Sequence, residues 1–219
     1  PDLVQNADIA RQSAEEGMVL LKNNERTLPL KKVRNYALFG KSSYNFIVGG
    51  TGSGRVNYKH AVSIIEGLEE MKGNVLPSLN QFYQNFIDSI QRTATPSLKI
   101  RPRNLVDFAA EPALPLSYIT EAARKTDVAI ITLGRNAGEL WDREEDDYFK
   151  LSGTEKDLLK TVCDVFHAKG KKVVVILNIA GPIEIANWRD LPDAILLAWQ
   201  TGQEGGHAVA NVLNWKVNP

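Results

Sequence analysis

The sequence predicts a three-layer α/β/α sandwich built on a mostly parallel sheet of about six strands. Several short segments, such as "VAIIT" and "VVVIL", are apolar at nearly every position, as expected of strands that are covered on both faces. Amphipathic helical segments alternate with them, which is the order typical of α/β proteins. The 219 residues suffice for one large core, and we expect residues 1–219 to form a single domain.

The N-terminal half is expected to contribute three helices and two strands. Gly17 is expected to end the first helix and Gly73 the second, because glycine is favoured just past a helix end. Ile64, Ile65 and Leu68 fall on one face of the second helix. The helices are expected at residues 8–17, 61–73 and 79–93, and the strands at residues 18–23 and 35–40.

The middle of the chain carries a weaker signal. From about Thr95 to Leu116 several prolines predict a long ordered loop, neither a core element nor a domain boundary. A helix is expected next, at residues 117–126, with Ser117 as its N-cap.

The C-terminal half shows the clearest alternation of strands and helices. Ser152 and Glu155 have the spacing of a capping box, and Gly170 follows the end of the helix that they begin. The strands are expected at residues 127–134, 172–178 and 193–200, and the helices at residues 152–170 and 204–214.

Charge and hydropathy exclude two kinds of partner. Lys+Arg and Asp+Glu number 26 each, so no overall field attracts nucleic acid or an anionic membrane. The longest apolar runs are far shorter than the roughly 20 residues of a transmembrane helix. The chain begins at Pro1 and stops at "WKVNP", and we expect it to be an excised piece of a longer polypeptide.

Ligands of parallel α/β sheets bind outside the carboxyl ends of the strands. Four loops are therefore expected to meet at one edge of the sheet. They are the glycine-rich loop after the strand at 35–40, then "RNAGELWDREEDDYFK", "AGPIE" and "QTGQEGG" after the three later strands.

The glycine-rich loop "GGTGSGRV" runs from Gly49 to Val56. A phosphate-binding P-loop needs Lys where this chain has Arg55, and Ser or Thr where it has Val56. The glycine spacing also departs from the dinucleotide-binding pattern, so nucleotide binding is disfavoured. A tight turn that requires positive φ is the structural alternative.

The acidic segment "ELWDREEDD" begins with Glu139. Most of its carboxylates are expected to be solvated, and a calcium loop is excluded because Asp147 and Gly153 stand where Gly and Glu are required. Glu139 differs from the others because it follows a strand, comes directly after Gly138 and lies two residues before Trp141. Neighbouring carboxylates and an aromatic ring raise the pKa of such a carboxyl group, which suits a general acid.

Other catalytic patterns are absent from the sequence. Ser53 lacks the G-x-S-x-G frame of a hydrolase nucleophile. His60, His167 and His207 are scattered, so no metal site is expected. Cys163 lies among apolar residues of a helix and is expected to be a core thiol.

Five segments, in this order, resemble the second domain of family 3 glycoside hydrolases, the β-glucosidases and their relatives. They are "ARQSAEEGMVLLKNNERTLPL", "GGTGSGRV", "GRNAGELWDRE…YFKLSGTEKDLLKTV", "VVVILNIAGPIEI" and "AWQTGQEGGHAVANVL". The resemblance spans nearly the whole chain and is weakest between about Val75 and Pro115. It implies an α/β sandwich that follows a barrel domain; the barrel carries the nucleophilic Asp and the sandwich a Glu that acts as acid and base.

By this resemblance Glu139 is the expected acid/base, and Ser53, with Gly52 and Gly54 beside it, is the expected sugar contact. Many relatives have glycine after the Glu, where this chain has Leu140. Trp141 is either a stacking platform for the leaving-group sugar or a packed anchor. The implied activity is retaining hydrolysis of terminal β-linked sugars, without a metal or cofactor, and the family favours a periplasmic or secreted enzyme. A non-catalytic carbohydrate-binding or interaction module is the alternative, and a nucleotide-binding flavodoxin-like domain comes third.

Overall fold

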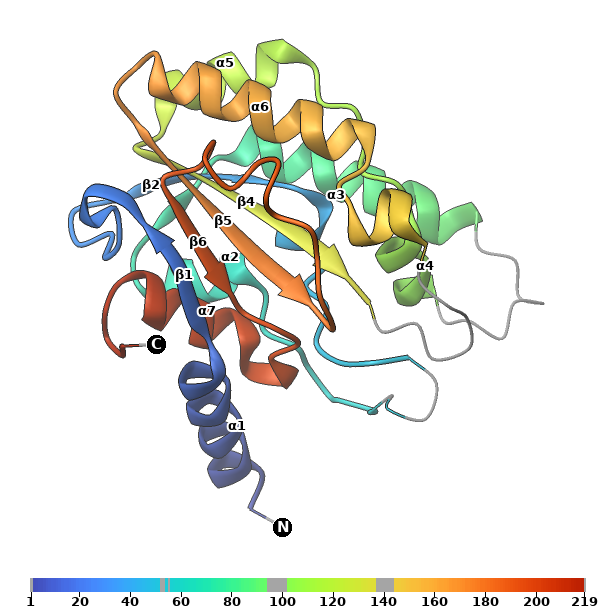
Figure 1. Cartoon of the computed structure of the whole chain (residues 1–219). Coiled ribbons are helices and arrows are strands. Elements are labelled where there is room, and N and C mark those ends of the chain that lie inside the picture. Colours follow the sequence, from blue (N-terminus) through green and yellow to red (C-terminus); the bar gives the residue numbers. More distant parts are fainter. Residues whose placement is uncertain (1, 52–53, 55, 94–101, 137–143, 219) are drawn as a thin grey trace.

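The computed structural model describes residues 2–218 apart from 52–53, 55, 94–101 and 137–143. Its strands are β1 (Val19–Asn23), β2 (Asn35–Phe39), β3 (Asn74–Val75), β4 (Val128–Arg135), β5 (Lys172–Ile179) and β6 (Ala194–Leu197). They form one sheet in the order β1-β6-β5-β4-β2-β3 (Figure 1). β1 pairs antiparallel with β6, and every other neighbouring pair is parallel. The predicted mostly parallel sheet is confirmed.

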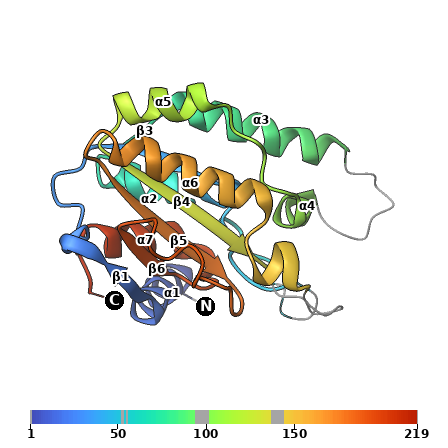
Figure 2. The same ribbon diagram turned by 45° about the horizontal axis from the view of Figure 1, so that its top comes forward.

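Helices cover both faces of this sheet, as predicted. One face is covered by α3 (Pro77–Thr93), α5 (Leu116–Lys125) and α6 (Gly153–His167), and the other by α2 (Ile64–Glu70) and α7 (Gly205–Leu213). The N-terminal helix α1 (Leu3–Gly17) packs against α7. Figure 2 shows α3, α5 and α6 together on one side of the strands. Of the helices in the described part of the chain, none is long and apolar enough to cross a bilayer.

The core consists of two apolar clusters, one on each face of the sheet. All eight residues of β4 are buried. Val128 and Ile130 belong to the cluster beneath α2 and α7, whereas Ala129, Ile131 and Leu133 belong to the cluster beneath α3, α5 and α6. Because successive side chains of a strand point to opposite faces, a strand between two helical layers is apolar at most positions, and Thr132 and Arg135 are the polar residues of β4.

Helix ends follow the predicted local signals at two places. α1 and its stop at Gly17 are confirmed, although the helix begins earlier, with the Asp2 carboxylate accepting the backbone N–H groups of Val4 and Gln5. At α6 the Ser152 hydroxyl accepts from the Glu155 N–H, and the Glu155 carboxylate accepts from the Ser152 N–H, which completes the capping box.

Two expectations for the middle of the chain are wrong. The segment expected to be a loop contains α4 (Pro102–Phe108). Proline is favoured at the first position of a helix, where its missing N–H would have no partner, so Pro102 begins a helix instead of excluding one. Ser117 does not cap α5, because the helix starts at Leu116 with Pro115 at the N-cap position.

Candidate functional site

Strands β2, β4, β5 and β6 run parallel, so their carboxyl ends lie at the same edge of the sheet. The loops that follow them are tied together by hydrogen bonds between residues far apart in the sequence. The predicted meeting of loops at this edge is borne out for the residues that the structure describes, as the following contacts show.

The loop after β2 starts with a close approach to β4. Gly40 has φ +84°, and a Cβ atom there would lie 2.3 Å from the carbonyl oxygen of Thr132. The Ser43 hydroxyl oxygen lies 2.7 Å from the Thr132 hydroxyl oxygen and 2.8 Å from the Phe39 carbonyl oxygen. Only glycine fits at residue 40, and the chain leaves β2 along a fixed path.

A buried amide holds the next part of that loop. The Asn178 side chain at the end of β5 accepts a hydrogen bond from the Ile47 N–H (2.6 Å) and donates to the Ile47 carbonyl oxygen (2.9 Å). It also donates to the carbonyl oxygen of Trp199 (2.8 Å), just past β6. Asn178 is fully buried, so one side chain ties the loops after β2 and β6 to the end of β5.

Two residues that flank the glycine-rich loop, Val48 before it and Val62 after it, are attached to the loop after β6. The Gly202 N–H donates to the Val48 carbonyl oxygen, and the Val62 N–H donates to the Gln203 carbonyl oxygen, each at 2.8 Å. The two ends of the stretch 49–61 are therefore held close together at the loop after β6.

Two glycines of this loop, Gly49 and Gly54, have open space around them. A Cβ atom on Gly54 would meet nothing within 4 Å, and one on Gly49 would meet only a Val56 methyl group at 4.0 Å. Neither residue has a positive φ, so the tight-turn interpretation is wrong at these two positions. Gly52, Ser53 and Arg55 lie outside the described residues.

Arg135, the last residue of β4, fastens both ends of the segment that carries Glu139. Its Nε donates to the Tyr148 carbonyl oxygen (2.7 Å) and one terminal nitrogen to that of Lys150 (3.3 Å). Its two terminal nitrogens each lie 2.7 Å from a carboxylate oxygen of Glu155. The Arg135 and Glu155 side chains are 7% and 9% exposed, so this bidentate pair is buried.

The predicted residues Glu139 and Trp141, together with Leu140 between them, lie outside the described residues. The end of the acidic segment is described, and Glu144, Glu145 and Asp146 are exposed there, which confirms the solvated interpretation for these three residues. Two of them lie in a short π-helix, η4 (Glu145–Phe149), which was not expected from the sequence.

A second buried carboxyl group, that of Glu111 in the segment before α5, contacts the start of the loop after β2. Its two oxygens are 3.2 and 3.0 Å from the Lys41 N–H nitrogen. Burial raises the pKa of Glu111 to about 7, although the Lys41 N–H and ammonium group oppose the shift. Burial also lowers the pKa of the Lys41 side chain. These groups border a pocket of about 290 Å³ that is lined by Lys41, Asp107, Glu111, Arg135, Asn136, Tyr148 and Glu155, among others.

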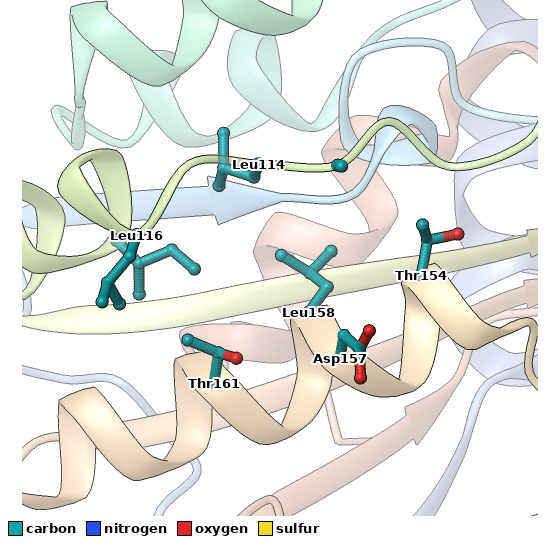
Figure 3. Close-up of a pocket in the computed structure, with 8 residues that line it drawn as sticks. Leu114, Leu116, Thr154, Asp157, Leu158 and Thr161 are labelled. Carbon is teal, nitrogen blue, oxygen red and sulfur yellow. The ribbon is translucent and has the colours of Figure 1, made fainter.

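Another pocket, of about 340 Å³, lies between α6 and the segment that leads into α5. Figure 3 shows Leu114 and Leu116 on that segment and Leu158 on α6 around it, with Asp157 beside them. None of the four loops contributes a lining residue. We therefore treat this pocket as separate from the candidate site.

The other reactive residues have structural partners. Cys163 is buried, and burial raises the pKa of its thiol to about 12, which confirms a core thiol. His60 lies 3.0 Å from Glu66, and His167 lies 2.8 Å from Asp193. Across the described part of the chain, no group of three or more His, Cys, Asp and Glu residues is arranged to hold a metal ion.

Sequence reasoning missed several residues at this edge. Arg135 was counted as the first residue of a loop, Asn178 only as the last residue of a strand, and Glu111 as part of a loop. Trp199 is 43% exposed and has φ +57°, an uncommon conformation for a bulky residue. A polar residue at the end of an otherwise apolar strand is the signal that identifies the first two.

Comparison with known proteins gives concordant matches. Residues 18–219 match the family model described as the glycosyl hydrolase family 3 C-terminal domain. Beta-glucosidase A of Butyrivibrio fibrisolvens is 32% identical, with 98% of this chain and 28% of that protein aligned. Beta-glucosidase of Ruminococcus albus is 31% identical, with 93% of this chain and 21% of that protein aligned.

A solved structure agrees in fold over the entire chain. It is beta-glucosidase 3B from Thermotoga neapolitana in complex with glucose, at a TM-score of 0.90 and 43% identity, covering 100% of this chain and 30% of that one. The chain thus spans less than a third of the length of these relatives.

Proposed function

This chain belongs to the glycosyl hydrolase family 3 C-terminal domain family, and from that premise we propose that it is the acid/base-bearing domain of a retaining β-glycosidase. Glu139 protonates the departing glycosidic oxygen while an Asp attacks the anomeric carbon, and Glu139 then deprotonates the water that releases the sugar. The two carboxyl groups of such a pair stand about 5–5.5 Å apart. The substrates are terminal β-linked sugars of the glucoside type, as the names of the relatives suggest.

The observation that carries the proposal is the anchoring of both loops at one edge. Arg135 holds the two ends of the segment around Glu139, and the loop after β6 holds the two ends of the segment around Ser53. A general acid and a sugar contact must be held in a fixed geometry to act on the same bond. The anchors hold the described ends of both segments at the same edge of the sheet, which supports the proposal.

The glycine-rich loop is assigned to sugar binding. Open space at Gly49 and Gly54 means that the glycines are not required by neighbours within the domain at these positions. We assign Ser53, Gly52 and Gly54 to the sugar and place Trp141 beside the leaving group. Small residues let the backbone approach a ligand closely.

The nucleophilic Asp is assigned to a barrel domain of the same polypeptide. This chain covers only 21–30% of the length of its relatives, which leaves ample room for such a domain. The mechanism uses two carboxyl groups and a water molecule, so it requires neither a metal nor another cofactor.

Glu139→Ala in the full-length polypeptide tests the assignment. We expect kcat/KM to fall by about 10²–10⁴-fold on alkyl glucosides, whose leaving groups need a proton. The fall should be much smaller on 2,4-dinitrophenyl glucoside, and azide should restore turnover, since it attacks without a general base. Glu144→Ala, at an exposed residue nearby, is the matched control. Equal losses on both substrates without azide rescue would refute the role of Glu139.

A further inference from the structure

The carboxylate of Asp107 contacts the beginning of both candidate loops. Its Oδ1 accepts a hydrogen bond from the side-chain amide of Asn45 (2.6 Å), and its Oδ2 accepts one from the side-chain amide of Asn136 (2.9 Å). Asn45 precedes the glycine-rich loop, and Asn136 directly follows β4, before the segment that carries Glu139. One carboxylate therefore joins two loops that are 91 residues apart where they begin.

The two asparagines of this bridge are buried, and their hydrogen bonds to Asp107 are partly buried. Asn45 and Asn136 are 6% and 2% exposed, and the Tyr148 hydroxyl donates to the carbonyl oxygen of Asn136. The Lys41 ammonium group donates to the Asp107 carbonyl oxygen at 3.0 Å. α4 is thus attached through its backbone as well as through the Asp107 carboxylate. Hydrogen bonds to an ionised acceptor are roughly twice as strong as neutral ones, so Asp107 is a stiff connection between the loops.

We propose that Asp107 is a positioning residue, which fixes Asn136, where the segment that carries Glu139 begins, relative to Asn45, which precedes the glycine-rich loop. The inference rests on the proposed function, because it gives a role in catalysis to a residue that acts through Asn45 and Asn136. A displacement of about 1 Å in a catalytic group can lower the rate about 10²-fold. Loss of the bridge therefore impairs proton transfer more than it impairs the fold.

Asp107→Asn in the full-length enzyme replaces one of the two acceptor oxygens of the bridge with a donor NH₂ group. The new side chain has one acceptor oxygen, and its NH₂ group faces an NH₂ donor, so at least one of the two hydrogen bonds is lost. We expect kcat/KM on an alkyl glucoside to fall about 10–100-fold. kcat/KM on 2,4-dinitrophenyl glucoside should fall less than threefold, and azide should raise turnover, as for an enzyme with a misplaced acid/base.

Asp127→Asn is the matched control, because Asp127 directly precedes β4, at the end opposite Asn136. The Asp127 carboxylate accepts from the Arg34 and Asn35 N–H groups at 3.1 and 2.9 Å, far from the candidate loops. We expect a comparable fall in melting temperature without any change in the ratio of activities on the two substrates. The proposal is overturned if Asp107→Asn lowers both activities by the same factor, as a general loss of folded protein would.

A double-mutant cycle tests the bridge even if Asp107→Asn does not fold. Asn45→Ala and Asn136→Ala each detach one loop from Asp107, so the second change has little left to remove. We expect the double variant to lose no more than about twofold beyond the worse single variant in kcat on the alkyl glucoside, because residues of one network are not additive. Multiplicative losses would overturn the inference.

Glu139→Ala, assayed in parallel, separates this inference from the proposed function. If Glu139→Ala shows no dependence on the leaving group, the proposed function fails. If it does show that dependence and the Asp107 variants do not, only the positioning role fails.

Discussion

Removing the Arg135 guanidinium should destabilise the domain more than any other single change at the candidate site. Arg135→Met keeps an apolar side chain of similar length but leaves the Glu155 carboxylate, 9% exposed, without its cation. Breaking a buried ion pair by removing one partner costs about 3–5 kcal/mol. The carbonyl oxygens of Tyr148 and Lys150 lose a donor as well, so we expect the upper half of that range.

Urea denaturation of the purified domain, followed by circular dichroism, measures this loss. The double variant Arg135→Met/Glu155→Gln is the control, because it removes the buried charge while keeping an acceptor for the Ser152 N–H (2.9 Å) that caps α6. We expect the double variant to recover at least about 1 kcal/mol, since a neutral amide is less costly to bury than an unpaired carboxylate. A loss below about 1 kcal/mol in the single variant would refute the stabilising role of the buried Arg135–Glu155 ion pair, because surface ion pairs contribute no more than that.

Three further predictions concern other parts of the domain. Burial holds the pKa of Glu111 at about 7, above its ordinary value of 4.5. Between these two pH values the native state binds a proton that the unfolded state has lost. The free energy of unfolding therefore falls as pH rises through this range, by up to about 3 kcal/mol. Glu111→Gln should flatten that fall in urea titrations from pH 4 to 8, and an unchanged slope would contradict the assignment. Gly40→Ala, whose Cβ would lie 2.3 Å from the Thr132 carbonyl oxygen, should cost about 2 kcal/mol or more, whereas Gly54→Ala should change stability by no more than about 0.5 kcal/mol in thermal melts; equal effects would contradict the close approach. The isolated 219-residue chain should melt cooperatively yet not hydrolyse aryl β-glucosides or aryl N-acetyl-β-glucosaminides, and turnover that disappears in Glu139→Gln would show that it needs no second domain.

Local signals account for what the sequence predicted well. β4 and β5 are runs of apolar residues, and their burial on both faces follows from that pattern alone. The capping box of α6 needs only two residues three apart. Because these features depend on neighbours in the sequence, they can be read without knowing the topology.

The missed features depend on residues that meet only after folding. Asn45, Asp107 and Asn136 come from three separate parts of the chain, and no periodicity relates them. α4 was missed because proline composition indicates a loop unless the position of the proline within a helix is known. The pairing of β1 with β6 is likewise a contact between the two ends of the chain.

The proposed function places the nucleophilic Asp on a second domain, and the arrangement of the four loops agrees with that assignment. The four loops leave a single edge of one sheet, so any carboxylates that they carry approach a bound sugar from the same side. Retaining hydrolysis needs carboxyl groups on opposite sides of the scissile bond. The described acidic residues near Glu139 do not supply the second group, because Glu144 points to solvent and Glu145 and Asp146 pair with Lys150 at 2.5 and 3.6 Å. Under the proposed function, the candidate site therefore supplies one carboxyl group of the catalytic pair, and we expect the second to face it from another domain.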